Sequence, residues 1–320
     1  MRYLGQSDIS ILGTPWNELI NVIKTATTLH HQNDFVQPIK PYLRYENLKN
    51  RIIAMPAYIG GDIGTAGIKW IASFPANIEK GIPRAHSVTI LNDRDTGVPL
   101  CLINTTRVSA IRTAAVSGMF ITEIHSRMPP LEKVDIGIIG FGPIGQSHLD
   151  MIKSLLGTRV HRIRIFDLKR PSQNVLEMYK DDPIEFVNRW QDAFNDADVF
   201  MTCTVSSERY INEKPKQGSL HLNVSLRDYF PDMRKFMTHI IVDDWDEICR
   251  ENTDIERMHV QSGLTRNDTI SLSELSNLSV QLKTHDVSMF NPMGLAIYDI
   301  AIARYYYDQS VIKNVGIELY

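Results

Sequence analysis

Cysteine is scarce in this chain of 320 residues: there are only three, at positions 101, 203 and 249. An odd number at such wide spacing supports neither a disulfide framework nor a zinc site. Cys101 and Cys203 lie in apolar, strand-like runs, so we expect both in the core. The sequence therefore predicts a protein of a reducing compartment, the cytoplasm, with no metal centre.

Long apolar runs and an excess of positive charge are also absent. No stretch approaches the roughly 18 apolar residues of a membrane helix, and residues 1–10 lack the apolar core of a signal peptide. The net charge is −3, and no basic block is present. We therefore expect neither nucleic acid nor a membrane as a partner. The remaining composition, with 43% hydrophobic residues, is that of an ordinary globular protein, and the length predicts about two domains.

The most informative segment is the glycine-rich run at 140–145 (GFGPIG). It follows an apolar strand-like segment, 134–139, and opens a helical pattern, 143–156. A second apolar strand then ends at Asp167, 22 positions after the last glycine. An ordinary flexible turn would not need this context, whereas a dinucleotide-binding turn does: glycines approach the pyrophosphate, a helix N-terminus meets its charge, and an acid binds the ribose. The expected cofactor contacts are Gly140, Gly142, Pro143, Ile144, Gly145 and Asp167.

The first part of the chain has the pattern of a helix followed by an antiparallel sheet. Residues 15–35 show helical spacing of apolar side chains, and a hairpin turn is expected at 92–97. A further helix is predicted from about 105 to 124, capped by Thr105 or Thr106 and ended by the prolines of 128–130. The expected strands are 51–55, 66–73, 86–91 and 98–103.

From residue 134 the pattern changes to strands that alternate with helices. This alternation favours a parallel, doubly wound sheet. The last helical pattern, 294–309, is apolar and rich in tyrosine, and is either a terminal core helix or a helix that faces a second subunit. The expected strands are 134–139, 162–166, 198–204, 219–224 and 238–242.

Three charged residues stand in unusual surroundings. Lys69 lies in a strand whose two faces are both largely apolar, so it either has a specific partner or cavity, or lies on an edge strand and reaches water. Arg112 lies on a helix face of small apolar residues; it is paired internally or, as we favour, aimed at an anionic ligand. Asp228 follows a strand of the second half, where ligands of such sheets bind, and is a candidate general base. A solvated loop acid, or a partner of Arg227, is its simpler interpretation.

Five motifs, in this order along the chain, resemble the ornithine cyclodeaminase/μ-crystallin family. They are 55–58 (MPAY), 67–77 (GIKWIASFPAN), 112–115 (RTAA), 140–145 (GFGPIG) and 294–299 (GLAIYD). The resemblance implies an α/β protein in which a Rossmann-type, doubly wound parallel sheet, residues 126–293, binds NAD. This domain is inserted into an α+β substrate-binding and dimerisation domain formed by residues 1–125 and 294–320. The implied assembly is a homodimer.

The resemblance also implies roles for single residues. Lys69 and Arg112 match the residues that hold the substrate carboxylate, and Asp228 matches the catalytic carboxylate. We accordingly expect Asp228 and Lys69 to be catalytic. Further expected cofactor contacts are Thr204, Arg112, Met293 and Gly294.

Several positions depart from the family pattern. Lys40 stands where arginine is usual, and Arg84 where ornithine-acting members carry a small or hydroxyl residue; Leu226 and Arg227 replace two glycines. Asn291 and Pro292 stand where the family's Lys-Ser precedes x-Gly. These departures argue against ornithine as the substrate. They resemble one subgroup of the family, whose substrate is an amino-acid conjugate with three carboxylates. The expected substrate contacts are Lys40, Arg44, Lys69, Arg84 and Arg112, although solvation could explain Arg44 and Arg84.

The resemblance to this subgroup implies that the reaction is the NAD-dependent oxidation of a secondary amine. Hydride leaves the glutamyl α-carbon, and water hydrolyses the imine to 2-oxoglutarate and L-2,3-diaminopropionate, a siderophore precursor. Two alternatives remain open. One is another family activity: ornithine cyclodeaminase, ketimine reductase or amino-acid dehydrogenase. The other is a non-enzymatic binding protein, as the μ-crystallins are.

Overall fold

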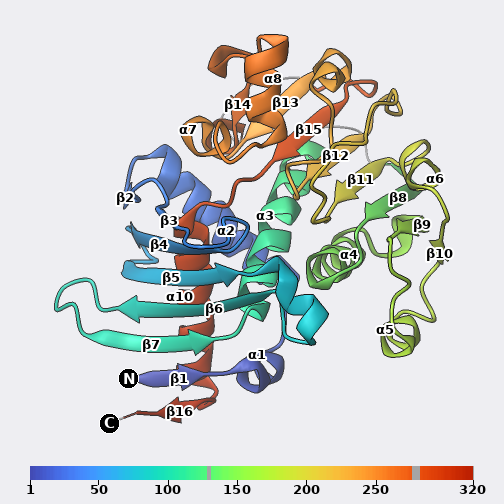
Figure 1. The fold of residues 1–320 in the computed structure, drawn as a ribbon. Coiled ribbons are helices and arrows are strands. Elements are labelled where there is room, and N and C mark those ends of the chain that lie inside the picture. The colour runs from blue at the N-terminus through green and yellow to red at the C-terminus, as the bar shows by residue number, and fades with distance from the viewer. Residues whose placement is uncertain (128–130, 276–281, 320) are drawn as a thin grey trace. The chain divides into compact units, whose positions relative to one another are not determined.

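Two β-sheets organise the computed structural model, which describes residues 1–127, 131–275 and 282–319 (Figure 1). Each sheet belongs to its own unit of the chain. Unit 1 comprises Met1–Val116 and Gly294–Tyr320, and unit 2 comprises Ser117–Met293. The division falls inside a helix, α3 (Arg107–His125), whereas the domain boundary expected from the sequence, at 125, lies at that helix's end. The prolines expected to end this helix lie outside the described residues.

The sheet of unit 1 has the order β16-β1-β7-β6-β5-β4-β2, with β3 pairing to β4. The four longest strands pair antiparallel, as predicted. Four short strands, β1, β2, β3 and β16, were not predicted, because two or three residues carry no periodic signal. The strands are β1 (Arg2–Leu4), β2 (Phe35–Val36), β3 (Tyr42–Leu43), β4 (Arg51–Ile59), β5 (Thr65–Ser73), β6 (Ala85–Asn92), β7 (Pro99–Asn104) and β16 (Ile317–Glu318).

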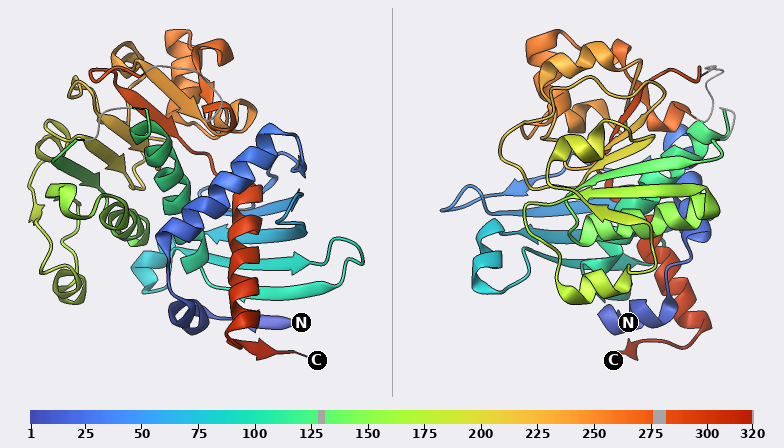
Figure 2. Two further views of the ribbon diagram at one scale, coloured as in Figure 1. Left: turned by 180° about the vertical axis from the view of Figure 1, so that it is seen from behind. Right: turned by 90° about the vertical axis from the view of Figure 1, so that its right-hand side faces the viewer.

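One face of this sheet is covered by α10 (Ala296–Ile312), which also packs along α2 (Trp16–His31). Seen from behind, the two helices cross the sheet side by side (Figure 2). The buried residues of α10 are mostly apolar and lie on all of its sides, as is typical of a helix in the core; Tyr306, for example, is fully buried. The interpretation as a core helix is therefore confirmed. The other helices of the unit are α1 (Gln6–Leu12) and the 3-10 helix η1 (Pro75–Lys80).

Unit 2 contains an eight-stranded sheet in the order β10-β9-β8-β11-β12-β15-β13-β14. All of its strand pairs are parallel, which confirms the predicted doubly wound class. Cys203, expected in the core, is only half-buried and follows β11, whereas Cys101 is fully buried. The strands are β8 (Val134–Ile139), β9 (Val160–Phe166), β10 (Ile184–Phe186), β11 (Val199–Thr202), β12 (Leu220–Asn223), β13 (His239–Val242), β14 (Ile270–Ser271) and β15 (Ser288–Asn291).

The helix that follows the first strand of unit 2, α4 (Pro143–Leu156), has the bounds that the sequence predicts. Gly142 is its N-cap, Pro143 supplies a preset φ at the first helical position, and Gly157 ends it at a positive φ. None of the helices in the described parts of the chain has both the length and the apolar character of a membrane span. The remaining helices are α5 (Gln173–Met178), α6 (Trp190–Phe194), α7 (Trp245–Ile248), α8 (Asp254–Ser262) and α9 (Leu272–Leu275), with the 3-10 helices η2 (Gly157–Arg159), η3 (Pro231–Phe236) and η4 (Arg266–Asp268).

Candidate functional site

Unit 1 contains a buried group of charges in which two cations share one carboxylate oxygen. Lys69 lies on β5, which is an inner strand between β4 and β6, and only 2% of it is exposed. Its Nζ donates to Asp299 Oδ1 at 2.9 Å and to Ser109 Oγ at 2.7 Å. Arg112 Nε donates to the same Asp299 oxygen at 2.8 Å. The prediction of a specific partner for Lys69 is thus confirmed, and the edge-strand alternative is wrong.

The second oxygen of Asp299 and the second edge of Arg112 remain available. Asp299 Oδ2 is buried and accepts no hydrogen bond within the described chain. Likewise, Nη1 and Nη2 of Arg112 donate to no described residue, because the pairing with Asp299 uses Nε alone. Arg112 is therefore paired internally, which leaves its role toward an anionic ligand as a prediction. A planar guanidinium edge of this kind suits a carboxylate.

Positive charge exceeds negative charge in this group. Lys40 is also buried, and its Nζ donates to the carbonyl oxygen of Gly294 at 2.9 Å. Burial, together with the positive charges of Arg112 and Lys40, lowers the pKa of Lys69 to about 8, although Asp299 acts in the opposite direction. Burial raises the pKa of Asp299, but Arg112 and Lys69 outweigh it and hold that pKa below its usual value. Lys69 and Arg112 are two cations around the one carboxylate of Asp299, and this excess favours the binding of a further anion.

Gly294 allows Arg112 to approach this closely. Its φ is +84°, and a Cβ at this position would lie 2.8 Å from Arg112 Nη1. Gly294 was expected at the cofactor, and in the structure it belongs to the charge group of unit 1. Met293, the other residue expected there, belongs to unit 2, and its N–H donates to Asp243 Oδ1 at 3.0 Å.

The two other expected cations belong to a different group at one end of the same sheet. The Arg44 guanidinium lies over the ring of Tyr42, 5.0 Å from its centroid. Arg84 Nη1 lies 3.4 Å from Ser73 Oγ. Arg51, which the sequence did not indicate, also lies over Tyr42, at 5.7 Å. The five cationic candidates are thus distributed over two places.

The glycine loop of unit 2 has the geometry of a dinucleotide-binding turn. A Cβ at Gly140 would lie 2.6 Å from the carbonyl oxygen of Cys203, and one at Gly145 would lie 2.2 Å from that of Gly140. By contrast, nothing lies within 4 Å of a Cβ at Gly142, which caps α4 and has Pro143 and Ile144 after it. Two glycines are therefore required by close packing, and the third leaves open space at a helix N-terminus. This arrangement fits a pyrophosphate.

Asp167, at the end of β9, ties two loops together. Its Oδ2 accepts from the N–H of Phe141 at 2.7 Å, and its Oδ1 accepts from that of Lys169 at 2.8 Å. Each carboxylate oxygen has two lone pairs, so each can accept a further hydrogen bond from a ribose hydroxyl.

Asp228 is fully buried beyond the end of β12, so its interpretation as a solvated loop acid is wrong. Its Oδ1 accepts from Thr204 Oγ1 at 2.5 Å, and its Oδ2 accepts from Ser225 Oγ. Thr204 thus contacts the candidate base, and its expected contact with the cofactor stays a prediction. Thr204 and Ser225 follow β11 and β12, which are neighbouring parallel strands, so the three side chains meet at the carboxyl edge of the sheet. The two hydroxyls fix the orientation of this carboxylate, which is the candidate general base.

The backbone around Asp228 is held by Asp254, which the sequence did not indicate. Asp254 Oδ2 accepts from the N–H groups of Asp228 and Tyr229 at 3.0 and 3.1 Å, while its Oδ1 accepts from Arg209 Nε at 2.7 Å. The nearby Leu226 has a φ of +65°, a conformation that favours glycine, at the position where glycine is usual in the family. Asp254 N–H donates to the Leu226 carbonyl at 2.7 Å and so helps to hold this loop.

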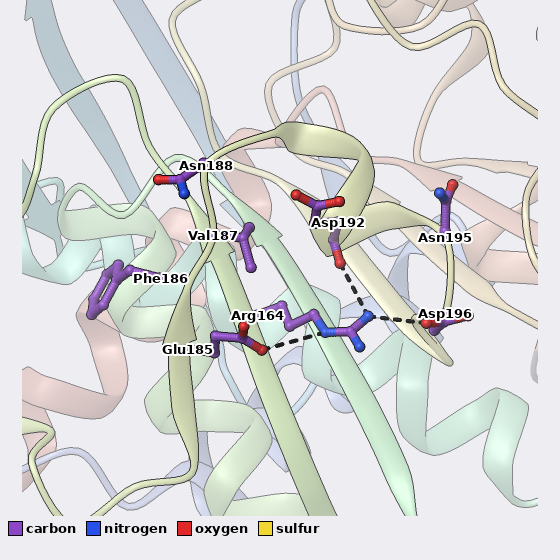
Figure 3. A pocket seen from close by; sticks show the side chains of 8 residues that line it. All are labelled: Arg164, Glu185, Phe186, Val187, Asn188, Asp192, Asn195 and Asp196. Carbon is purple, nitrogen blue, oxygen red and sulfur yellow. Dashed lines mark hydrogen bonds and ion pairs between the residues drawn. The ribbon is translucent and has the colours of Figure 1, made fainter.

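A hollow of about 380 Å³ on unit 2 belongs neither to the glycine loop nor to the residues around Asp228 (Figure 3). Its cation, Arg164, points between Glu185 and Asp196 and contacts both, and it also donates to the carbonyl of Asp192. The charge of Arg164 is thus already matched, and the hollow gives no indication of an anion site. In the described residues no group of three or more His, Cys, Asp or Glu side chains could hold a metal ion.

The fold and the two groups of residues define a protein with a Rossmann-type unit, which carries a dinucleotide-binding loop, and a second unit with buried, paired cations. The ornithine cyclodeaminase/mu-crystallin family matches residues 6–314, and the chain belongs to this family. The family resemblance noted in the sequence is therefore confirmed.

Individual relatives cover all or nearly all of the chain. N-((2S)-2-amino-2-carboxyethyl)-L-glutamate dehydrogenase of Staphylococcus aureus is 32% identical over 344 residues, which cover 100% of this chain and 98% of the relative. Alanine dehydrogenase of Archaeoglobus fulgidus is 25% identical and covers 94% and 92%. Among solved structures, the Δ1-pyrroline-2-carboxylate reductase of Thermococcus litoralis with NADH and L-proline has a TM-score of 0.89 at 22% identity, with full coverage of both chains. An archaeal alanine dehydrogenase dimer with bound NAD has a TM-score of 0.86 at 23% identity, covering 100% and 99%.

Proposed function

We propose that this protein is an NAD-dependent dehydrogenase of N-[(2S)-2-amino-2-carboxyethyl]-L-glutamate, which it converts to 2-oxoglutarate and L-2,3-diaminopropionate for siderophore biosynthesis. The observation that carries the proposal is the buried excess of positive charge around Asp299, where Lys69 and Arg112 share one carboxylate oxygen. A substrate with three carboxylates supplies the missing negative charge. The Staphylococcus aureus relative, named for this activity, supports the choice of substrate.

The substrate is oriented by its carboxylates. The free edge of Arg112 and the ammonium of Lys69 bind the carboxylate next to the reacting carbon, with Lys40 adding charge. Asp299 keeps both cations in place. The glycine loop and Asp167 would hold NAD, which would supply the redox chemistry by accepting the hydride.

Asp228 moves the protons of the reaction. It takes the proton from the secondary amine, so that the nitrogen lone pair forms the C=N bond as hydride leaves the α-carbon. Asp228 then passes that proton to solvent, and it accepts a second proton from the water that attacks the resulting imine. Breaking the C–N bond then gives 2-oxoglutarate and the free amine. Overall, one amine, one NAD⁺ and one water give a ketone, an amine, NADH and a proton.

A substrate panel tests the proposal. With purified protein and NAD, the tricarboxylate conjugate should generate reduced nicotinamide, and mass spectrometry should identify the two products. Turnover of alanine, or reduction of a cyclic imine, in place of the conjugate would assign another activity of the family. Cofactor binding without turnover of any amino acid would indicate a binding protein.

A homodimer is part of the proposal. In unit 1 the residues that alternate with those facing α10 form an apolar sheet face that stays partly exposed: Trp70 is 44% exposed, and Pro56, Ile68 and Val88 lie around it in register. Large exposed apolar faces mark interaction surfaces. The NAD-bound dimer among the similar structures supports this assembly. Light scattering of the purified protein tests it, and a monomer mass contradicts it.

The cofactor preference should be NAD over NADP. Asp167 can accept from the ribose hydroxyls and repels a 2′-phosphate. The exposed Lys169 and Arg170, which follow it, act in the opposite direction but lie beyond the strand end. Comparing kcat/KM for the two cofactors measures the preference. Equal or better efficiency with NADP would show that Asp167 does not select the cofactor.

Binding of the product 2-oxoglutarate should weaken as the pH rises above about 8. The pKa of Lys69 in the folded protein is about 8, and only its protonated form attracts a carboxylate. Affinity should therefore be constant below pH 8 and fall by up to about tenfold per pH unit above it. Calorimetric titrations follow this, and Lys69→Arg, which stays charged, should remove the dependence. Constant affinity of the unaltered protein from pH 7 to 9.5 would place the carboxylate elsewhere.

A further inference from the structure

Arg51 and Arg84 lie together at one end of the unit 1 sheet. Arg51 is paired with Ser73 across β4 and β5, and Ser73 is paired with Ala85, the neighbour of Arg84, across β5 and β6. Arg84 also reaches Ser73 with its side chain, at 3.4 Å. Tyr42 supports the pair from the other side, because the Arg51 guanidinium lies over its ring. The pairing of β4, β5 and β6 thus brings the two guanidinium groups to the same end of the sheet.

The charge of this arginine pair is not compensated. Neither Arg51 nor Arg84 forms an ion pair with an acidic residue in the described parts of the chain, and both side chains are half-buried. Burial lowers the pKa of Arg84, and the positive charge of Arg51 lowers it further. Two partly desolvated like charges side by side cost free energy unless an anion lies between them.

We propose that Arg51 and Arg84 form a second carboxylate subsite, which binds a carboxylate of the substrate other than the one held by Lys69 and Arg112. This inference rests on the proposed function and deepens it, because it gives Arg51 a role in specificity. Tyr42 is a positioning residue in this subsite, since it holds Arg51 through its ring.

The strand register places this subsite on the same side of the sheet as Lys69. Directly opposed residues of antiparallel strands point to the same side of the sheet. Every second residue of a strand shares a face, so Lys69, Ile71 and Ser73 of β5 all point to the side on which Asp299 lies. Arg51, opposite Ser73, therefore points to that side as well. Four residues along a strand span roughly 13 Å. Long cationic side chains at the two ends shorten this gap to the size of a conjugate with carboxylates on both of its halves.

The subsite also explains discrimination against diamino acids. A ligand such as ornithine carries an ammonium at its far end, and would bring it toward two guanidinium groups. Repulsion at this place lowers its affinity, while a second carboxylate is attracted. The arginine pair thus selects for charge at the far end of the substrate.

Calorimetry with the unoxidised conjugate and no cofactor tests the subsite independently of turnover. The probes are the tricarboxylate and two analogues in which either the γ-carboxylate or the diaminopropionyl carboxylate is an amide. Arg51→Gln and Arg84→Gln should each weaken tricarboxylate binding about ten- to a hundredfold. One of the two amides lacks the carboxylate that the subsite binds. For that amide, the two variants and the unaltered protein should have the same affinity. Arg94→Gln, at an exposed arginine of the same unit, is the matched control.

The possible outcomes separate this inference from the proposed function. Equal weakening for all three ligands, or none, in variants with unaltered melting curves would overturn the subsite. Arg51→Lys distinguishes charge from structure: it should retain part of the affinity, and its failing like Arg51→Gln would also count against the subsite. If the unaltered protein binds the conjugate in an Arg51-dependent way but does not oxidise it, the proposed function fails and the subsite stands. If the unaltered protein oxidises the conjugate but Arg51→Gln has no effect on binding, the subsite fails and the proposed function stands.

Discussion

Replacing Asp228 by asparagine is expected to lower turnover on the order of a hundredfold or more, with NAD affinity near that of the unaltered protein. The amide has the shape of the carboxylate but cannot take up the amine proton. The neighbouring hydroxyls of Thr204 and Ser225, which donate to Asp228, can rotate to accept from the amide instead, so the local structure should persist. Steady-state rates and cofactor titrations measure the two quantities.

A control and a pH series make this result decisive. Asp232, an exposed acid in the following 3-10 helix, is the matched control, and Asp232→Asn should leave turnover unchanged. Activity of Asp228→Asn within a few-fold of the unaltered protein across the pH range would mean that Asp228 only organises the loop. The proposed acid–base role would then be wrong.

Replacing Asp299 by asparagine is expected to lower the free energy of unfolding by about 3–5 kcal/mol. Lys69 and Arg112 would remain buried without a counter-charge, and each would repel the other. The pKa of Lys69, already lowered to about 8 by burial, would fall further because Asp299 is the group that raises it. Substrate binding should weaken with it. Denaturant unfolding gives the free energy, and calorimetry gives the affinity.

The matched control lies on the same helix. Asp308 pairs with Arg304 at 2.9 Å, but both side chains are partly exposed, so Asp308→Asn should cost no more than about 0.5 kcal/mol. A loss of less than 1 kcal/mol for Asp299→Asn would contradict the electrostatic account of the buried group.

The elements predicted well are those whose signals are local. Strand 134–139 and the helix Pro143–Leu156 were predicted with their bounds, because glycine and proline mark both ends of the helix. β15 (Ser288–Asn291) was missed, since four residues without alternation become a strand only by pairing with β12 and β13 on either side. Its place in the sheet is a tertiary property.

The site was predictable only in part for the same reason. The apolar surroundings of Lys69 indicated that it needs a partner, but that partner, Asp299, is 230 positions away and stands in a helix that looks like ordinary core. Arg51 was not predicted as a site residue, because an arginine at the start of a strand is usually solvated. Its significance comes from the register that brings it beside Ser73 and Arg84.

The central claim is that hydride leaves the glutamyl α-carbon of the conjugate. Turnover of a conjugate with deuterium at that carbon tests it most directly, with mass spectrometry of both products and of the nicotinamide. The account predicts deuterium in the reduced cofactor, and 2-oxoglutarate and L-2,3-diaminopropionate without the label. Free glutamate that retains the deuterium, together with an unlabelled reduced cofactor, would show oxidation at the other carbon of the C–N bond and would contradict the account.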